Sequence, residues 1–157
     1  MVPLKLRIIG INMKIFIACD HAAFEAKEAL KVFFMREKLQ VVDLGTNSNE
    51  SVHYPHFAIK LSHEVLKHPD YCGILLCGTG IGVSIVANKF KGIRAALCRS
   101  VEDAKLSREH NNANVLCLGA RSNSIEELKK IIETWLNTSF AGGRHAERLN
   151  IFSDLGC

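Results

Sequence analysis

The amino-acid sequence predicts an α/β fold, a single Rossmann-like domain of three α/β/α layers with a five-stranded parallel sheet in the middle. Apolar runs of strand length alternate with segments of helical period along the chain, with no repeat or linker between them. The runs are almost continuously apolar, as expected of parallel strands that are buried on both faces. The 157 residues are 48% hydrophobic and 23% charged, so one domain of this length can bury its own core.

The first half of the chain alternates three strands with two helices. The segment 24–38 places its apolar residues on one helical face. Pro55 is tolerated in the first turn of a second helix, and Pro69 closes the segment that follows. We therefore expect strands at 14–19, 40–43 and 71–76, and helices at 24–38 and 55–67.

The second half continues the alternation after a loop with three glycines at 78–82. Ser124 and Glu127 form a capping-box pattern at the start of the last predicted helix. The expected strands are 93–98 and 114–118, and the expected helices are 83–90, 101–109 and 124–136. The alternation ends there, and the segment 144–148, Arg-His-Ala-Glu-Arg, is the densest basic cluster.

Charge and cysteine content argue against several classes of function. The net charge of +4 comes from 20 basic and 16 acidic residues scattered along the chain, which favours a pocket for a small anion over a nucleic-acid surface. No apolar run approaches the roughly 20 residues that span a membrane, so we expect no membrane partner. The six cysteines include no C-x-x-C pair, which favours buried thiols in a reducing compartment, the cytoplasm.

The first twelve residues precede the first predicted strand. They carry Lys5 and Arg7 ahead of a short apolar patch, but the run is too short for a signal peptide and no small-residue cleavage site follows. We expect 1–12 to be an N-terminal extension, an alternative start or a weak targeting element. Residues 13–157 are expected to form the functional domain.

Ligands of open parallel sheets bind outside the carboxyl ends of the strands. This rule brings several polar residues to one edge of the predicted sheet. They are Asp20 and His21 after the first strand, Cys77–Gly82 after the third, Arg99 and Ser100 after the fourth, and Gly119–Arg121 after the fifth. His110 and Asn111 end a helix instead, so the rule does not place them at this edge.

The glycine loop has the pattern of an anion site. Gly78, Gly80 and Gly82 let the backbone turn tightly and point N–H groups inward, beside a helix N-terminus that favours negative charge. The Gly-Lys-Ser/Thr ending of a Walker A loop is missing, and Val83 stands where a dinucleotide fingerprint requires glycine. The glycine spacing alone is equally compatible with a purely structural turn.

Cys77 stands at the end of the third strand and faces the start of the next helix. Such a position lowers the pKa of a thiol below its free value of about 8.5 and makes it a usable base or nucleophile near neutral pH. An inert core cysteine is the alternative, and Cys19, Cys98 and Cys117 fit that alternative.

For three other pairs of residues, each considered alone, the sequence allows either a structural or a functional role. A helix cap, a helix-end cap and a solvated surface pair are the respective structural interpretations. The pairs are Asp20 with His21, His110 with Asn111, and Arg144 with Arg148.

Together, these segments resemble one family, the B-type ribose-5-phosphate isomerases, which share their fold with the galactose-6-phosphate isomerase subunits. The resemblance runs in order and with family-like spacing from Met13 to about Arg148. It rests on Cys19-Asp-His21, Tyr54-Pro-His56, Gly73-Ile-Leu-Leu-Cys-Gly-Thr-Gly-Ile-Gly82, Ala87-Asn-Lys-Phe90, Gly92-Ile-Arg-Ala-Ala96, Ser107-Arg-Glu-His-Asn111, Asn114-Val115, Gly119 with Arg121, and Gly142-Gly-Arg-His145 with Arg148.

The resemblance implies an aldose–ketose isomerase that uses no metal and no cofactor. Cys77 is then the base that moves a proton from C2 to C1, His110 is the acid/base that opens the furanose ring, and Thr79 assists nearby. The implied substrate- and phosphate-binding set is Asp20, His21, Tyr54, Gly78, Gly80, Ile81, Gly82, Asn111, Arg121, Arg144 and Arg148. The family also implies a homodimer, or a tetramer of two dimers, whose active site lies between subunits, with His110, Asn111 and Arg121 supplied by the partner.

The substrate class has alternatives. A pentose phosphate of the pentose phosphate pathway is the leading expectation, and a six-carbon phosphate, allose 6-phosphate or galactose 6-phosphate, is the enzymatic alternative. A non-catalytic sugar-phosphate sensor is a remote alternative, because Cys77 and His110 are both present. His53 departs from the family, which has an acidic residue before the tyrosine, and we expect it to change hydrogen bonding at the pocket mouth.

Overall fold

A five-stranded sheet forms the centre of the molecule, in a computed structural model that describes residues 14–156. All four strand pairings are parallel and the strand order is β2-β1-β3-β5-β4, which confirms the predicted fold class. The chain reverses its direction of winding between β1 and β3, so a crevice opens at their carboxyl ends. The strands are β1 (Lys14–Cys19), β2 (Gln40–Asp43), β3 (Cys72–Cys77), β4 (Ala95–Leu97) and β5 (Val115–Gly119).

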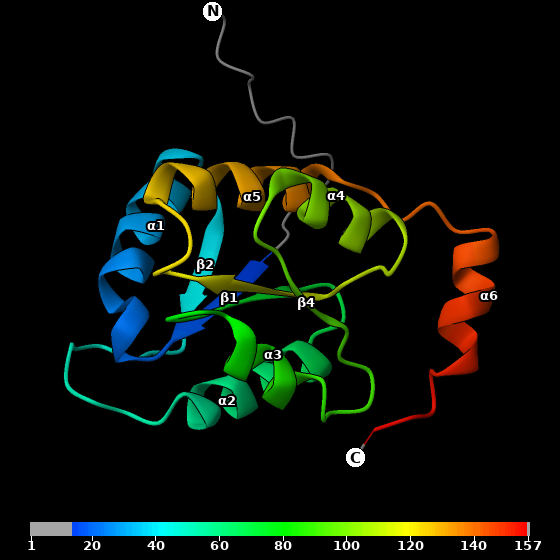
Figure 1. Ribbon diagram of the computed structural model, residues 1–157, viewed down its shortest axis with the longest axis horizontal. Helices are drawn as coiled ribbons and strands as arrows, with labels where there is room; N and C mark the ends of the chain where they lie inside the picture. Colours follow the sequence, from blue (N-terminus) through cyan, green and yellow to red (C-terminus); the bar gives the residue numbers. More distant parts are fainter. Residues whose placement is uncertain (1–13, 157) are drawn as a thin grey trace, which may run out of the picture.

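Helices cover both faces of the sheet (Figure 1). Successive strand residues point to opposite faces, so each face has its own core. Ile17 and Leu76 pack with Trp135 in one core, and Phe16 and Leu75 pack in the other. The helices of the first face are α1 (Phe24–Arg36), α4 (Val101–Glu109) and α5 (Ile125–Asn137), and those of the second are α2 (Tyr54–Lys67) and α3 (Ile81–Ala87).

The sheet has two ends that matter for function. We call the end where the strands finish the carboxyl edge, at the left in Figure 1, and the end where they start the amino edge. Each helix that joins two parallel strands must return from the carboxyl edge to the amino edge. The C-terminal end of α4 and the segment after α5 therefore lie at the amino edge.

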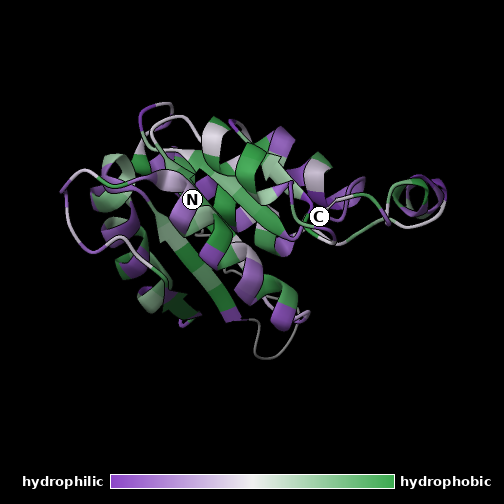
Figure 2. Cartoon of the chain, turned by 90° about the horizontal axis from the view of Figure 1, so that it is seen from below, coloured by the Kyte–Doolittle hydropathy of each residue, from purple (hydrophilic) through white to green (hydrophobic). Residues whose placement is uncertain are grey.

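One helix, α6 (Arg144–Ile151), was not predicted from the sequence. It stands away from the body of the molecule beside the amino edge (Figures 1 and 2), and none of its residues is buried. Without a buried face it leaves little core-facing pattern to recognise. The preceding glycines, Gly142 and Gly143, have φ angles of 66° and 55° and break the chain direction.

The remaining differences concern element boundaries. The strand predicted at 93–98 is shorter, because Ile93 and Arg94 precede β4 and Cys98 follows it. The helix predicted from residue 83 starts at Ile81, directly after the glycine loop. No helix within residues 14–156 is long and apolar enough to span a lipid bilayer. The expected extension at 1–12 lies outside the described residues.

Candidate active site

The glycine loop joins β3 to α3 in a tight turn that carries Cys77. Gly80 has a φ angle of 76°, and a Cβ atom there would lie 2.8 Å from the carbonyl carbon of Leu118. Only glycine fits such a position without strain. The backbone N–H of Gly80 donates a hydrogen bond to the Sγ atom of Cys77 at 3.1 Å. The turn thus directs a donor and the N-terminus of α3 at the thiol, which is 5% exposed.

A second loop, after β5, is bonded to the glycine loop of the same chain. The N–H groups of Ala120 and Arg121 donate to the carbonyl oxygens of Cys77 and Gly78, both at 2.9 Å. The Arg121 side chain lies over Gly78, where a Cβ atom would meet its Nη1 at 3.3 Å. This placement differs from the expectation that a partner subunit supplies Arg121. It agrees instead with the rule that residues following the strands share the carboxyl edge.

Asp20 and His21 follow β1 on the other side of the crevice. Asp20 is 7% exposed, and its Oδ1 accepts a hydrogen bond from the N–H of Ala22 at 3.0 Å, so it caps the short 3-10 turn η1 (His21–Ala23). The Nδ1 atom of His21 accepts a hydrogen bond from the N–H of Val52 at 3.2 Å. The expected structural role of Asp20 as a cap is therefore present, and His21 ties the loop after β2 to the site.

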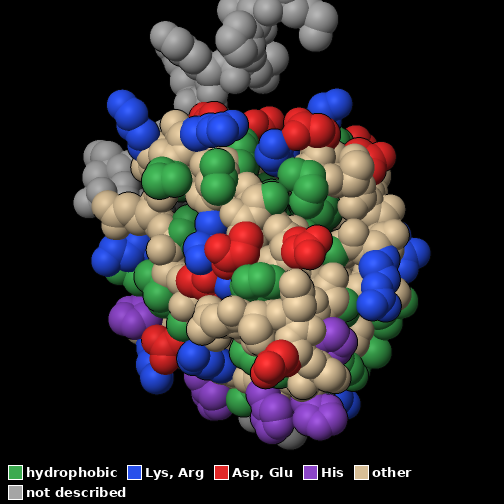
Figure 3. Space-filling model, turned by 90° about the vertical axis from the view of Figure 1, so that its left-hand side faces the viewer, with side chains coloured by type: hydrophobic (Ala, Val, Ile, Leu, Met, Phe, Trp, Pro, Cys, Tyr) green, Lys and Arg blue, Asp and Glu red, His purple; other side chains and the backbone are tan. Residues whose placement is uncertain are grey.

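Tyr54 borders the glycine loop from α2. A Cβ atom on Gly82 would lie 2.7 Å from its Cζ atom, so glycine at 82 is what allows the ring to approach. His53 stands just before it, at the N-cap of α2, without a side-chain capping bond. Its ring centroid lies 6.2 Å from that of His56. Histidine side chains gather at the bottom of the face that Figure 3 shows.

The other predicted site residues lie at the amino edge. His110 ends α4, and its ring stacks on that of His145 from α6, with centroids 4.2 Å apart and planes within 9°. The N–H of Ala141 donates to the carbonyl oxygen of Glu109 at 3.0 Å, which ties the approach to α6 to the end of α4. Asn111 follows His110, and the exposed Arg144 and Arg148 are on α6.

The predicted residues thus form two groups on opposite edges of the sheet. We call them the carboxyl-edge group (Asp20, His21, Tyr54, Cys77–Gly82 and Arg121) and the amino-edge group (His110, Asn111, Arg144 and Arg148). A strand of six residues such as β3 separates the two edges by about 20 Å. Residues that far apart do not act together on one small molecule within one chain.

Comparison with known proteins decides the family. The family model described as Ribose/Galactose Isomerase matches residues 15–152. The chain belongs to the ribose/galactose isomerase family. It is 43% identical to ribose-5-phosphate isomerase B of Escherichia coli K12 over 136 residues, which cover 87% of this chain and 91% of the relative.

Solved structures agree with this family. A ribose 5-phosphate isomerase from Thermotoga maritima superposes with a TM-score of 0.89 at 47% identity, covering 92% of this chain and 100% of that one. A ribose-5-phosphate isomerase B from Mycoplasma genitalium, solved with bound ribulose-5-phosphate, has a TM-score of 0.87 at 41% identity and covers 92% of this chain and 96% of that one.

In this member of the isomerase family, four further buried cysteines lie in the strands or directly beside them. Burial raises the pKa of Cys19 and of Cys72 to about 12 and that of Cys98 to about 11, and it also raises the pKa of Cys117. These thiols stay protonated at neutral pH. Cys19, Cys77, Cys98 and Cys117 form no disulfide within residues 14–156.

His145 is the residue that sequence reasoning did not single out. Burial lowers its pKa, and the neighbouring His110, Arg144 and Arg148 lower it further, whereas Glu109 opposes the shift. Its place after Arg144, in the segment Gly142-Gly-Arg-His145 that carries part of the family resemblance, was the available signal. Among residues 14–156, no three His, Cys, Asp or Glu side chains gather closely enough to hold a metal ion.

Proposed function

We propose that this protein is a ribose-5-phosphate isomerase that interconverts D-ribose 5-phosphate and D-ribulose 5-phosphate in the pentose phosphate pathway. The observation that carries the proposal is the Cys77 thiol at the crevice between β1 and β3, with the Gly80 N–H on its sulfur. The named relatives support the substrate, because those most similar in sequence and structure include enzymes named for this reaction.

In this proposal Cys77 acts as the base. The thiolate removes the proton from C2 of the open-chain aldose and returns it to C1, and the Gly80 N–H and the N-terminus of α3 stabilise its negative charge. The enediolate that forms between the two steps carries its charge on the oxygens of C1 and C2. Backbone N–H groups of Gly78–Gly82 hold these oxygens, with Thr79 beside them.

Ring opening and phosphate binding use the remaining residues. His110 transfers the proton that opens the furanose ring, while Asp20 and Asn111 hold sugar hydroxyls. The phosphate is held by His21 and by three arginines, because a guanidinium fork matches phosphate oxygens in pairs. These arginines are Arg121, Arg144 and Arg148.

A site that uses residues of both the carboxyl-edge and the amino-edge group requires two subunits. His110, Asn111 and the α6 arginines lie about 20 Å from Cys77 in one chain, so we propose a homodimer in which the amino-edge group of each subunit completes the carboxyl-edge group of the other. A tetramer of two such dimers keeps the same sites. Arg121 acts within its own chain, since it lies over Gly78.

A second candidate is the same isomerisation on a six-carbon phosphate. The matching family model covers galactose as well as ribose isomerases, and both reactions use a base, an enediolate and a phosphate site. The ratio of kcat/KM for ribose 5-phosphate to that for allose 6-phosphate and galactose 6-phosphate separates them. The proposal expects the pentose to be preferred.

The test is the Cys77→Ser variant, assayed for ribulose 5-phosphate formation in the presence of EDTA, since no step uses a metal. Loss of the base is expected to lower kcat by about 10²–10⁴-fold with little change in binding of the sugar phosphate. Cys98→Ser is the matched control, because this buried thiol lies outside the glycine loop and its loss should leave kcat unchanged. Wild-type turnover in Cys77→Ser, or loss of wild-type activity in EDTA, would contradict the mechanism.

We also propose a cytoplasmic location, in keeping with thiols that remain reduced. Residues 13–157 are proposed to form the isomerase domain, with residues 1–12 as an N-terminal extension.

A further inference from the structure

Two half-buried arginines lie at the amino edge without a counter-charge. Arg94 precedes β4, and its Nε donates to the carbonyl oxygen of Asn112 at 3.0 Å. Arg108, in the last turn of α4, donates to Asn112 Oδ1 at 3.2 Å and to the carbonyl oxygens of Ala113 and Thr138. All these partners are neutral. Within residues 14–156 no carboxylate forms an ion pair with either guanidinium, although both are less exposed than Arg36, Arg99, Arg121, Arg144 and Arg148.

The arrangement is electrostatically unfavourable as it stands. Burial lowers the pKa of Arg94 and of Arg108; for Arg108, Cys72 opposes this shift and the charge of Arg94 adds to it. Guanidinium groups nevertheless remain protonated in proteins, so both positive charges persist. Half-buried charges that are not paired destabilise a fold, and an anion between them would offset that cost.

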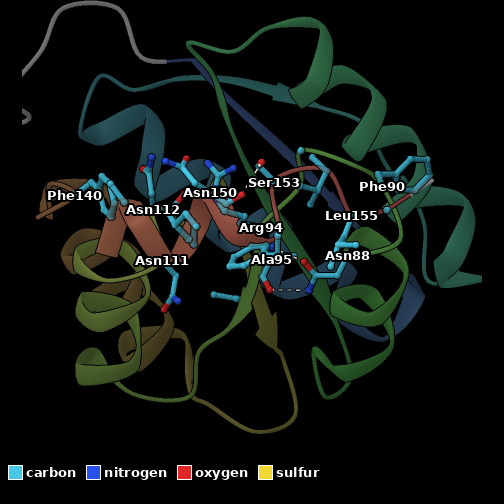
Figure 4. Close-up of a pocket in the computed structure, with 18 residues that line it drawn as sticks. Asn88, Phe90, Arg94, Ala95, Asn111, Asn112, Phe140, Asn150, Ser153 and Leu155 are labelled. Atoms are coloured by element: carbon cyan, nitrogen blue, oxygen red, sulfur yellow. Dashed lines mark hydrogen bonds between the residues drawn. The ribbon is translucent and has the colours of Figure 1, made fainter. Parts of the chain in front are cut away.

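Both arginines line one cavity of about 320 Å³. The side chain of Trp135 lines it as well, and its buried Nε1 donor has no acceptor in the described chain. The guanidinium carbon of Arg108 lies 5.1 Å from the centre of the Trp135 ring. Arg94 and Asn112 also border a larger cavity that residues of α6 line (Figure 4), so Arg94 stands between the two cavities. The cavity thus combines two cations with room for a small molecule and its water.

We propose that this cavity binds a small oxyanion, inorganic phosphate or a phosphate monoester, between Arg94 and Arg108. The unused N–H groups of the two guanidinium forks suit the paired oxygens of a phosphoryl group. Within one chain the site lies at the other end of the sheet from the carboxyl-edge group, and neither Arg94 nor Arg108 belongs to the amino-edge group that completes the partner's site. Asp70 is the one acidic residue among those lining the cavity, and its charge opposes the anion.

The chain provides its own probe for this site, because Trp135 is its single tryptophan. Inorganic phosphate is added in steps to the full-length protein, and tryptophan fluorescence is measured after each addition. Potassium chloride keeps the ionic strength constant. A saturable change is expected. Arg94→Gln should weaken the response at least about tenfold, Asp70→Asn should strengthen it several-fold, and Arg36→Gln, on the exposed end of α1, should leave it unchanged.

Two further arms identify the source of the signal. Arg148→Gln removes an arginine of the proposed substrate-phosphate set but should keep the fluorescence response. If the Arg148→Gln variant lost the response, the signal would come from the active site and the proposal would be overturned. Acetate should give a weaker response than phosphate, and an equal one would overturn the preference for a phosphoryl group.

The proposal also fails if the wild-type protein shows no saturable response. If Asp70→Asn lowers the unfolding temperature and gives no stronger response, Asp70 itself neutralises the arginines and the anion site does not exist. Because the wild-type and Asp70→Asn titrations do not depend on Arg94→Gln folding, the proposal stays testable if that variant is unstable.

Discussion

Gly80 is the residue on which the geometry of the glycine loop depends most directly. Its left-handed backbone costs a residue with a Cβ atom roughly 1–2 kcal/mol, and that Cβ would also lie 2.6 Å from Leu97 Cδ1 and 2.8 Å from the Leu118 backbone. We expect Gly80→Ala to lower the free energy of unfolding by more than about 2 kcal/mol and to abolish turnover. The free energy of unfolding is measured by denaturant unfolding that is monitored by circular dichroism.

Gly142→Ala is the matched control for this effect. Gly142 also has a positive φ angle, 66°, but nothing lies within 4 Å of a Cβ atom placed there. It should show the backbone cost alone. Equal losses of stability in the two variants would mean that the contact with Leu118 has no energetic weight.

The buried ion pair of Lys27 and Asp43 makes a second prediction at this scale. Lys27 is fully buried, and its Nζ lies 2.5 Å from an Asp43 carboxylate oxygen that also pairs with Lys31 at 2.8 Å. Removing one member leaves a poorly solvated charge, so Lys27→Met should cost about 3–5 kcal/mol of unfolding free energy, nearer the lower value because Lys31 remains. Lys60→Met, on the exposed face of α2, is the control.

The same pair predicts how stability depends on pH. Burial alone would raise the pKa of Asp43, but the hydrogen bonds from Lys27, Lys31 and the Gly45 N–H outweigh it and lower that pKa below 3.8. A lowered pKa gives stability that is present above the unfolded value and is lost as the pH falls through the folded one. The unfolding free energy should therefore drop below about pH 4, and Asp43→Asn should flatten that drop.

At the scale of elements, local signals predicted most of the fold. Ser124 and Glu127 form the capping box that the sequence indicated, with reciprocal hydrogen bonds at the start of α5. The near-continuous apolar runs correctly predicted the parallel strands β1, β3 and β5, which are buried on both faces, whereas the edge strand β2 alternates between exposed and half-buried residues. The same reasoning could not find α6, since a helix that buries nothing leaves no core-facing period.

The independence of α6 from the core leads to a prediction about truncation. Neither core contains a residue beyond Leu136, so a chain that ends at Gly142 should keep its secondary structure and cooperative unfolding. It should lose at least about 10²-fold in kcat/KM, because Arg144 and Arg148 are missing. Circular dichroism and the isomerase assay measure the two effects.

A chain that ends at Phe152 is the control, since it keeps all of α6. It should retain most of the activity. If the shorter chain were fully active, the α6 residues would have no part in the reaction; if it failed to fold, α6 would contribute to the core in a way that its burial does not indicate.

At the scale of the whole molecule, the sequence predicted which residues gather at the carboxyl edge but not how the other residues of the candidate site are arranged. The rule for open parallel sheets correctly brought Asp20, Cys77 and Arg121 to one edge, and it correctly left His110 out. The family resemblance assigned Arg121 to the partner, whereas the Arg121 side chain lies over Gly78 of its own chain. The sequence could not show that His110 and α6 share the amino edge, because that depends on how the segment after α5 leaves the sheet.

The two edges lead to a prediction for mixed subunits. If a Cys77→Ser chain is combined with a His110→Ala chain, each hybrid dimer has one site with both changes and one site with neither. Random pairing makes about half of the dimers hybrids, so activity should recover to about a quarter of the wild-type value. Mixing Cys77→Ser with Arg121→Ala is the control, and it should show no recovery, because both residues belong to the carboxyl edge and every site carries one change. Recovery in the control, or none in the first mixture once hybrids are verified, would contradict the division of the site between the two edges.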